Sequence, residues 1–374
     1  MKDWIARRLS RQEKPLCRAL WREIFTEDSE AFLDYYDRWK TEENQCYGIF
    51  EEDRLVSMLE LNPYRLMVLG HEVESRYIIA VATRPEYRHQ GLMKRLLKKS
   101  LEDMRTEGLP FLYLMPAEEA IYDPFGFRFI YESNAGTEIS SAPDRITAKV
   151  QQDPERSMSE ILEFSDRVLP HISDCYTRRD ASYYRMLLAE LKSESGGLVQ
   201  VREQDRIIGL VPFWGGKNPE IREILSLPED GEAVLRAAVS EIAGYGQNQP
   251  VDGPVPEIKI PVMGASFPME EKKPVIMARI CHAGRFLELF RLKKGNLELE
   301  LHLTDALIPE NSGVYRWQLT EHGSRAEKSG SGNHDAKTVF CTEAELVSWL
   351  LGNRTEGFPK QVQTCRAPFI NEIV

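Results

Sequence analysis

The segment that most constrains the fold runs from Tyr77 to Met104 and reads YIIAVATRPEYRHQGLMKRLLKKSLEDM. Its first half is a near-continuous apolar run, which is typical of a strand buried on both faces. After Gly91 the apolar residues recur at helical spacing, which predicts an amphipathic helix. These residues are Leu92, Met93, Leu96, Leu97, Leu101 and Met104. The segment therefore predicts a strand, a turn and a helix, as in an α/β fold.

The turn between this strand and this helix contains Arg88, His89, Gln90 and Gly91. A helix N-terminus leaves backbone N–H groups without partners and carries a partial positive charge. Glycine has no Cβ to hold a ligand away, and the three preceding side chains add donors. The turn is therefore suited to an anion such as a pyrophosphate. An ordinary structural turn is the alternative interpretation, because this spacing of arginine and glycine also arises by chance.

The length of the chain indicates how many domains it has, and its net charge indicates what kind of partner it binds. A chain of 374 residues is too long for one ordinary core, so two or three domains are expected. The net charge of −11 argues against nucleic acid as the main partner and is compatible with a cationic substrate. An acidic surface that only keeps the protein soluble is the alternative interpretation.

The cysteines and the apolar runs indicate the compartment. The six cysteines are scattered without a C-x-x-C pair, and the seven histidines form no ligand pattern with them. We therefore expect no disulfides, no structural zinc and a cytoplasmic location. No apolar run reaches about 18 residues, so no membrane span is expected. The N-terminus also lacks the apolar stretch of a signal peptide.

The first 135 residues predict a mixed sheet with helices. Residues 1–45 are expected to be helical, with Ser29 as a candidate N-cap. Apolar segments flank Glu52 and Asp53, which predicts a hairpin, and Asn62–Pro63 is expected to break its second strand. Residues 110–116 predict a short buried strand. Residues 117–132, AEEAIYDPFGFRFIYE, predict a helical turn, a Pro-Phe-Gly turn and a last strand.

The middle of the chain predicts a second α/β unit. Residues 133–144 are rich in turn-forming residues and indicate strand ends and a linker. Helices are expected over 157–171 and 181–194, and strands over 197–203 and 206–214. Residues 221–244 repeat the strand–turn–helix order, but their turn, Pro228–Glu232, carries three acids in place of the basic residues. Either a second copy of the fold has lost its anion site, or the likeness is a coincidence.

The last third of the chain predicts a further α+β region. Residues 244–274 are rich in proline and glycine, which indicates a boundary. Residues 275–293 predict a strand end and a helix, and 295–323 alternate like a hairpin with its turn at Pro309–Gly313. Residues 336–352 predict a strand and then a helix that begins at Thr342, with Glu345 completing a capping box.

Two motifs resemble a known family. VATRPEYRHQGLMKRLL closely resembles motif A of the GNAT acetyltransferases, Q/R-x-x-G-x-G/A, with Met93 where the pattern prefers Gly or Ala. AIYDPFGFRFIYE is similar to the IYxxFGY segment of one branch, the enhanced intracellular survival (Eis) family. There Pro124 stands in place of an arginine and Phe127 in place of a tyrosine. FTEDSEAFLDYY near the start, MARI at 277–280 and IPEN at 308–311 extend the resemblance along the chain.

The resemblance implies three domains. Residues 1–136 would be a GNAT domain with the acetyl-CoA site, built as a mixed central sheet flanked by helices. Residues 137–270 would be a second, degenerate GNAT-like domain, which fits the acidic turn. Residues 271–374 would be a sterol-carrier-protein-like α+β domain that supplies the C-terminus. The resemblance also implies a homo-oligomer, either a trimer or a hexamer.

The resemblance also assigns roles to residues. Backbone groups of Ile79, Val81, Ala82 and Thr83 would bind the pantetheine arm of acetyl-CoA. The pyrophosphate would be bound by Arg88, His89, Gln90, Gly91, Leu92 and Met93. Tyr122 would be the general acid that protonates the departing thiolate. The terminal carboxylate of Val374 would help to deprotonate the amine, and no metal is implied.

The sequence therefore predicts an acetyl-CoA-dependent N-acetyltransferase, an acyltransferase that acts on a cationic small-molecule amine of aminoglycoside or polyamine type. Neither nucleic acid nor a membrane is an expected partner. One alternative is a non-catalytic protein that binds CoA and an apolar ligand, and another is a protein-lysine or N-terminal acetyltransferase. Six acids could make the amine pocket negative, or be ordinary surface carboxylates. These acids are Glu27, Asp28, Glu60, Glu118, Glu119 and Glu372.

Overall fold

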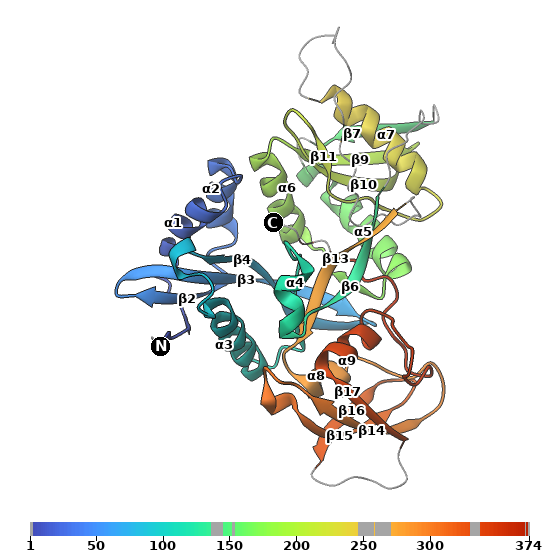
Figure 1. Cartoon of the computed structure of the whole chain (residues 1–374). Coiled ribbons are helices and arrows are strands. Elements are labelled where there is room, and N and C mark those ends of the chain that lie inside the picture. The colour runs from blue at the N-terminus through green and yellow to red at the C-terminus, as the bar shows by residue number, and fades with distance from the viewer. Residues whose placement is uncertain are drawn as a thin grey trace. The chain divides into compact units, whose positions relative to one another are not determined.

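The computed structural model describes residues 3–135, 145–151, 154–245, 258, 271–329, 337–370 and 372. The chain divides into two compact units. The first unit contains Met1–Asp28, Lys40–Tyr131 and Ile276–Pro368, and the second contains Ser29–Trp39, Glu132–Val275 and Phe369–Val374. Each unit therefore combines segments that are distant in the sequence (Figure 1). The three consecutive domains expected from the sequence stay a prediction.

The main sheet of the first unit runs in the order β1-β2-β3-β4-β5-β13-β6. Its strands are β1 (Arg7–Arg8), β2 (Gln45–Glu51), β3 (Arg54–Val68), β4 (His71–Thr83), β5 (Phe111–Leu114), β6 (Arg128–Ala135) and β13 (Glu271–Ile280). β2, β3 and β4 pair antiparallel, whereas β4 and β5 pair parallel. The predicted mixed sheet is therefore confirmed.

The expected strand break at Asn62–Pro63 is wrong. β3 continues through both residues, and Pro63 lies opposite Arg76 of β4. On the other side of β3, the pairing with β2 reaches only as far as Leu61, which lies opposite Gln45. Pro63 therefore lies beyond the pairing with β2, so its missing N–H removes no bond to that strand.

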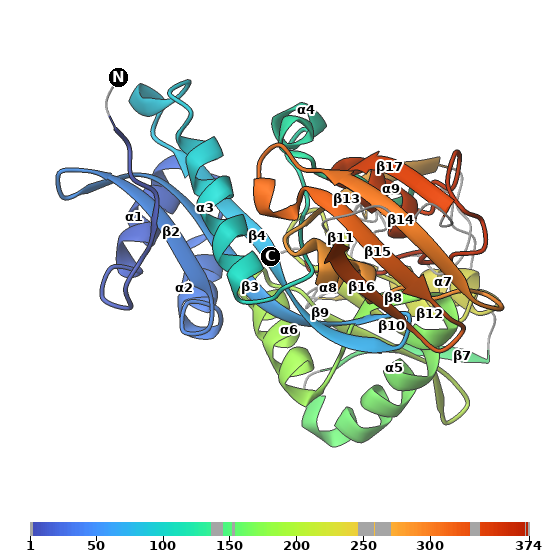
Figure 2. The same cartoon turned by 90° about the horizontal axis from the view of Figure 1, so that it is seen from below.

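Two helices cover opposite faces of this sheet. α1 (Pro15–Ile24) packs on β3 and β4, and α3 (Leu92–Thr106) packs on β2, β3 and β4 (Figures 1 and 2). The expected apolar stripe of α3 is confirmed, because all of its members except the partly buried Met93 are buried in one core. That core contains Leu92, Leu96, Leu97, Leu101 and Met104, with Tyr47, Leu59 and Leu61 from the sheet.

The segment after β5 follows the predicted order. It forms a short helix, α4 (Glu119–Tyr122), then a 3₁₀ turn, η2 (Asp123–Phe125), and then β6. Gly126 closes the turn with a φ of +81°, a conformation that glycine adopts without strain. A further 3₁₀ turn, η1 (Pro85–Tyr87), lies between β4 and α3.

Strand β13 comes from the last third of the chain yet lies between β5 and β6. It pairs antiparallel with β5, with Met277 opposite Leu114 and Ile280 opposite Phe111. The sequence predicted the end of a strand here but not its partner. More than 130 residues separate the paired segments, and no local pattern encodes a pairing over such a distance.

The rest of the first unit is a four-stranded sheet with helices. The sheet has the order β16-β15-β14-β17. Its elements are α8 (Ala283–Leu287), β14 (Leu297–Thr304), η4 (Pro309–Asn311), β15 (Gly313–Leu319), β16 (Ser324–Ser329), β17 (Lys337–Thr342) and α9 (Glu343–Leu350). The predicted β14–β15 hairpin is confirmed. So is the capping box, because the side chains of Thr342 and Glu345 each accept from the other's backbone N–H.

The second unit contains a sheet of order β11-β10-β9-β7, with β12 also pairing to β10. Its elements are α2 (Glu30–Trp39), β7 (Ile146–Val150), η3 (Pro154–Ser157), α5 (Met158–Ile172), β8 (Cys175–Thr177), α6 (Ala181–Ser193), β9 (Gly197–Glu203), β10 (Arg206–Trp214), β11 (Glu220–Ile221), β12 (Leu225–Ser226) and α7 (Gly231–Gly244). The predicted helices and the β9–β10 pair are confirmed. The second predicted helix of the N-terminal region, α2, belongs to this unit and packs on α6.

The two expected linker or boundary regions, 133–144 and 244–274, lie mostly outside the described residues. Within the described ranges, no helix combines the length and the apolar character needed to cross a membrane.

Candidate active site

A β-bulge interrupts β4 inside the predicted pantetheine contact. Met58 of β3 lies opposite Ala82, and Glu60 lies opposite Ile79, so two β4 residues lie opposite one β3 residue. Within this bulge Ala80 has a φ of +52°. Such a left-handed conformation costs a non-glycine residue on the order of 1–3 kcal/mol and is concentrated at functional sites. No local sequence pattern indicates this bulge, because alanine is not typical of the left-handed region.

The predicted pantetheine residues extend past the end of β5. The parallel pairing of β4 with β5 joins Arg76 to Leu112 and Tyr77 to Tyr113. β5 ends at Leu114, which is level with Ile78, whereas β4 continues to Thr83. Residues 79–83 therefore have no β5 backbone beside them. This edge of β4 meets the requirement for a ligand that binds through backbone groups.

The predicted anion turn begins α3 as expected. Gly91 is the N-cap, with a φ of +76°, and no side chain of a described residue caps the helix. His89 is also left-handed, with a φ of +61°. A Cβ placed on Gly91 would have no atom within 4 Å, so the start of the helix faces open space. The backbone N–H groups of the first turn are therefore accessible to a ligand.

Arg88 provides an accessible cation at this turn. Arg88, His89 and Gln90 are all exposed. The Nε of Arg88 donates to the carbonyl of Thr83 at 3.2 Å, and Arg88 forms no ion pair with any described residue. Arg84, in contrast, is ion-paired with Glu23. Of these two arginines, Arg88 is the one free to bind an anion.

The remaining residues of the motif pack inward or pair with acids. Leu92 is buried, and Met93 is partly buried against the same core. Among the basic residues of the helix, Arg95 pairs with Asp3, Lys98 with Glu102 and Lys99 with Asp103. Lys94 forms no ion pair within the described ranges. Most of this basic face is therefore an ion-paired surface.

Tyr122 is buried in the core that also contains Leu92, Ile78 and Leu114. Its ring meets that of Phe127 edge to face, with centroids 5.7 Å apart. Burial raises the pKa of its hydroxyl to about 12. No described residue forms a hydrogen bond with this hydroxyl. The structure therefore brings a neutral phenol, β4 and the start of α3 into one core, as the role of a proton donor beside a bound thioester requires.

The candidate acids of the first unit differ in burial. In the first unit, Asp28 is half-buried and accepts a 2.6 Å bond from Trp21 Nε1, and burial raises its pKa. Glu60 is buried and accepts from Asn44, whereas Glu118 and Glu119 are exposed at the start of α4.

Val374, whose terminal carboxylate is the predicted base, is not among the residues that the structure describes. Nearby in the chain, Phe369, Ile370 and Glu372 are buried, and Tyr183 donates to Glu372 at 3.2 Å within the second unit. Phe369 and Glu372 are therefore anchored in that unit.

The second unit contains the predicted acidic counterpart of the anion turn. α7 follows the short strand β12 and begins after Asp230, its N-cap. Burial is the main cause that raises the pKa of Asp230, and the neighbouring Glu229 adds to it. A turn with these carboxyl groups repels a phosphate, which agrees with the loss of an anion site from this helix.

Two cysteines and a glutamate form a buried group that the sequence did not predict. Cys17 of α1, Cys46 of β2 and Glu60 of β3 place their ligand atoms within 4.8 Å of one another. Cys46 and Glu60 are directly opposite in the β2–β3 register. Cys46 also donates to Asn44 at 3.4 Å, and Asn44 donates to Glu60. These hydrogen bonds are what a buried polar group needs in a core.

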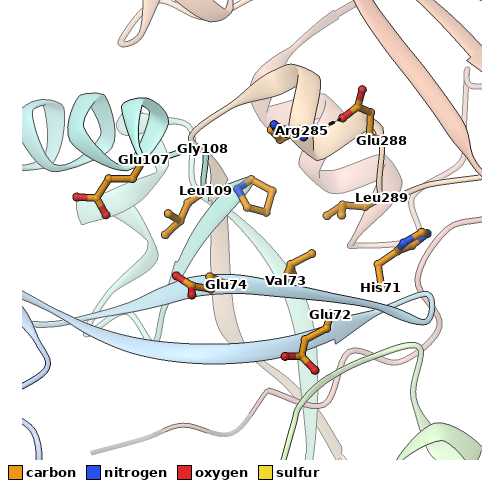
Figure 3. Close-up of a pocket in the computed structure, with 11 residues that line it drawn as sticks. His71, Glu72, Val73, Glu74, Glu107, Gly108, Leu109, Arg285, Glu288 and Leu289 are labelled. Atoms are coloured by element: carbon orange, nitrogen blue, oxygen red, sulfur yellow. Dashed lines mark ion pairs between the residues drawn. The ribbon is translucent and has the colours of Figure 1, made fainter.

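A pocket of about 430 Å³ lies elsewhere in the first unit. Side chains from the start of β4, the end of α3 and the α8 region line it (Figure 3). Its carboxylates have basic partners, such as Arg65 for Glu72 and Arg285 for Glu288. Helix α3 runs from the anion turn at Gly91 to Glu107 in the pocket wall, and its 15 residues span roughly 22 Å at about 1.5 Å per residue. It is therefore distinct from the candidate active site.

Two segments match the sequence profiles of known domain families. Residues 6–130 match the acetyltransferase (GNAT) domain, and residues 283–358 match the sterol carrier protein domain. Among curated proteins, the chain is similar to an uncharacterized N-acetyltransferase of Streptomyces avermitilis. The two are 22% identical over 322 residues, which is 76% of this chain and 75% of that protein.

Solved structures share the whole fold. A conserved protein from Enterococcus faecalis V583 has a TM-score of 0.76 at 17% identity, and a GCN5-related N-acetyltransferase from Anabaena variabilis has 0.71 at 16%, each over 100% of both chains. Eis1 from Mycobacterium abscessus has 0.63 at 15% identity over 97% of this chain and 94% of that one. A tandem GNAT protein from the clavulanic acid pathway has 0.50 at 11% over 75% and 99%.

Proposed function

Because this chain is a GNAT N-acetyltransferase of Eis-like architecture, we propose that it transfers the acetyl group of acetyl-CoA to a primary amine of a cationic small molecule. The observation that carries the proposal is Tyr122, a buried and neutral hydroxyl in the same core as β4 and the start of α3. The proposed acceptor is an amine of aminoglycoside or polyamine type.

The residues of this chain fit acetyl-CoA. Open space in front of Gly91, the uncapped start of α3 and the unpaired Arg88 suit a pyrophosphate. The edge of β4 past the end of β5 suits the pantetheine arm, because that arm carries amide groups that bond to backbone. When bound, acetyl-CoA supplies the activated acetyl group. The residues of this chain would hold acetyl-CoA, protonate the departing thiolate and deprotonate the amine.

Tyr122 is the proposed general acid. Acyl transfer from a thioester releases a thiolate, which needs a proton. With a pKa of about 12, the Tyr122 hydroxyl keeps its proton at neutral pH, and it gives the proton up as negative charge develops on the sulfur. No hydrogen bond to a described residue competes for this donor. Phe127 packs against the ring and fixes its plane.

The terminal carboxylate of Val374 is the proposed base. An amine attacks only when it is unprotonated, so a nearby anion must accept its proton. A terminal carboxylate has a pKa of about 3.5 in water, and burial near other acids raises it toward a useful range. Phe369, Ile370 and Glu372, which precede it in the chain, are buried.

The acidic character of the chain supports a cationic acceptor. The net charge is −11, and Asp28 is a half-buried carboxyl of the first unit that a cationic amine can pair with. Burial raises the pKa of Asp28, and an amine bound beside it would lower that pKa again.

The test is a thiol-release assay. The purified protein is mixed with acetyl-CoA and a panel of aminoglycosides, polyamines, lysine peptides and N-terminal peptides, and free CoA thiol is read. We expect turnover with the polycationic small molecules. Turnover only with peptides would identify a protein acetyltransferase. Binding of acetyl-CoA by calorimetry without turnover on any amine would identify a non-catalytic binding protein.

We also propose a cytoplasmic homo-oligomer, a trimer or a hexamer, with neither nucleic acid nor membrane as a partner. Light scattering coupled to size-exclusion chromatography measures the mass directly. A monomeric mass of 43.0 kDa would overturn the oligomer.

A further inference from the structure

Arg279 of β13 is a fully buried arginine that contacts the turn after Tyr122. Its Nε donates a 2.6 Å hydrogen bond to the carbonyl oxygen of Phe125, which lies in the 3₁₀ turn η2 directly after α4. One of its terminal nitrogens donates to the carbonyl of Ile280 at 2.5 Å. Its side chain has 0% exposure. The segment that carries Tyr122 is thus tied to a strand more than 140 residues away in the sequence.

Asp305 holds this arginine in place. Its two carboxylate oxygens accept from the two terminal nitrogens of Arg279, at 2.6 and 3.3 Å. The same carboxylate accepts from the backbone N–H of Leu307 and Ile308 and from the amide of Asn311. A planar guanidinium bonded to both oxygens of a fixed carboxylate has one orientation, so the Nε has one direction as well.

Glu343 closes the other side of the turn. Gly126 directly follows η2 with a φ of +81°, and a Cβ at this position would collide with Oε1 of Glu343. The same oxygen lies 3.7 Å from Arg279. Asp305 and Glu343 both belong to the last third of the chain. The turn is therefore held by that region from two directions.

Burial of this turn does not by itself require a charged network. Replacing a buried ion pair by apolar residues of similar volume is often neutral or stabilising, whereas a hydrogen-bonded guanidinium fixes a geometry. What it fixes here is the peptide at Phe125, three residues after Tyr122. A catalytic group that is displaced by about 1 Å can lose about a hundredfold in rate.

The geometry points to Arg279 as a positioning residue for Tyr122, with Asp305 and Glu343 as its supports. The inference rests on the proposed role of Tyr122 as the general acid. It gives the sterol-carrier-like region of the chain a part in acetyl transfer, because that region supplies Asp305 and Glu343, which hold Arg279 against the acid-bearing turn.

The test combines Arg279→Gln with Tyr122→Phe in the full-length protein. We expect Arg279→Gln to lower kcat by about 10- to 100-fold, with the KM for acetyl-CoA within about twofold, because the anion turn and β4 are untouched. In the Tyr122→Phe background, the same substitution should lower kcat by less than about threefold further, since residues that act through one another are not additive. Equal losses in the two backgrounds would overturn the positioning role.

Leu301→Ala is the matched control for destabilisation. Leu301 is fully buried in β14, in the same unit, and is not part of the Arg279 network. Assayed well below both Tm values, Leu301→Ala should lower Tm and leave kcat unchanged. A fall in kcat as large as that of Arg279→Gln would show that general destabilisation explains both.

Arg279→Lys is the second variant, should Arg279→Gln fail to fold. Lysine keeps a cation for Asp305 but cannot bond to Asp305 and Phe125 in the same fixed geometry. The same non-additivity with Tyr122→Phe is expected, and additivity would overturn the inference. Failure of the proposed function is read separately, because Tyr122→Phe alone would then leave kcat unchanged.

Discussion

The rings of Tyr122 and Phe127 meet edge to face, with centroids 5.7 Å apart and an angle of 71° between their planes. The contact joins the last residue of α4 to the residue that directly precedes β6, across the turn that Gly126 closes. It places the Tyr122 ring in the core of the first unit, and burial there raises the pKa of the hydroxyl to about 12.

Because the pKa of Tyr122 is raised, the free energy of unfolding should decrease at alkaline pH. The folded protein keeps the Tyr122 proton up to about pH 12, whereas the unfolded chain loses it near pH 10. The stability contribution of the neutral phenol is therefore complete below pH 10 and is lost as the pH rises toward 12. Urea unfolding at pH 8 and pH 11 should show a larger loss for the wild type than for Tyr122→Phe. Equal losses would contradict the raised pKa.

Tyr122→Phe should lower kcat by about 100-fold, because general acids typically contribute about 10²- to 10⁴-fold. The Kd for acetyl-CoA should stay within about twofold, since the turn and β4 are intact. Initial rates and calorimetry measure the two quantities. Tyr184→Phe is the control, because it removes another fully buried hydroxyl, bonded to Ser165 in the second unit, and should leave kcat unchanged. An unaltered kcat in Tyr122→Phe would remove the acid role.

Gly91→Ala should raise the Kd for acetyl-CoA and should lower the free energy of unfolding only slightly. A Cβ there enters the open space in front of α3, where the pyrophosphate is proposed to bind. The matched control is Gly108→Ala at the other end of α3, since Gly108 also has positive φ and no atom within 4 Å of its Cβ position. Both variants should lose a similar stability, about 1 kcal/mol. Only Gly91→Ala should raise the Kd, and equal Kd values would argue against this site.

Arg88→Ala should raise the Kd for acetyl-CoA by about 10- to 100-fold, because a hydrogen bond to a charged group contributes about 1.5–3 kcal/mol. The dependence of the Kd on salt should also become weaker. Arg65→Ala removes another exposed arginine, ion-paired to Glu72 at the far end of β3. Its Kd and its salt dependence should match the wild type. Calorimetry at two salt concentrations gives both quantities.

Adding residues after Val374, or deleting Val374, should lower kcat more than it lowers Tm. The extension moves the terminal carboxylate, whereas the burial of Phe369 and Ile370 keeps the preceding segment docked. A C-terminally tagged protein should therefore regain activity when the tag is cleaved back to Val374. Full activity of the tagged protein would exclude the terminal carboxylate as the base.

Local patterns in the sequence determined helices such as α3 and α9 and, within the candidate site, the anion turn. The spacing of Leu92, Leu96 and Leu101 predicted α3, and Thr342 with Glu345 predicted the start of α9, because periodicity and capping act over a few residues. Gly91 marked the anion turn for the same reason. Tyr122 came only from the resemblance of its segment to a family, since a tyrosine has no local signature of catalysis.

The tertiary structure decided what depends on distant neighbours. It made β3 continuous through Pro63, because β2 ends before that position. It placed the bulge at Ala80, inserted β13 between β5 and β6, and brought Arg279 to the carbonyl of Phe125. Strand register and buried ion pairs are fixed by contacts between segments that the chain brings together only on folding. A single sequence states the residues of such contacts but not their partners.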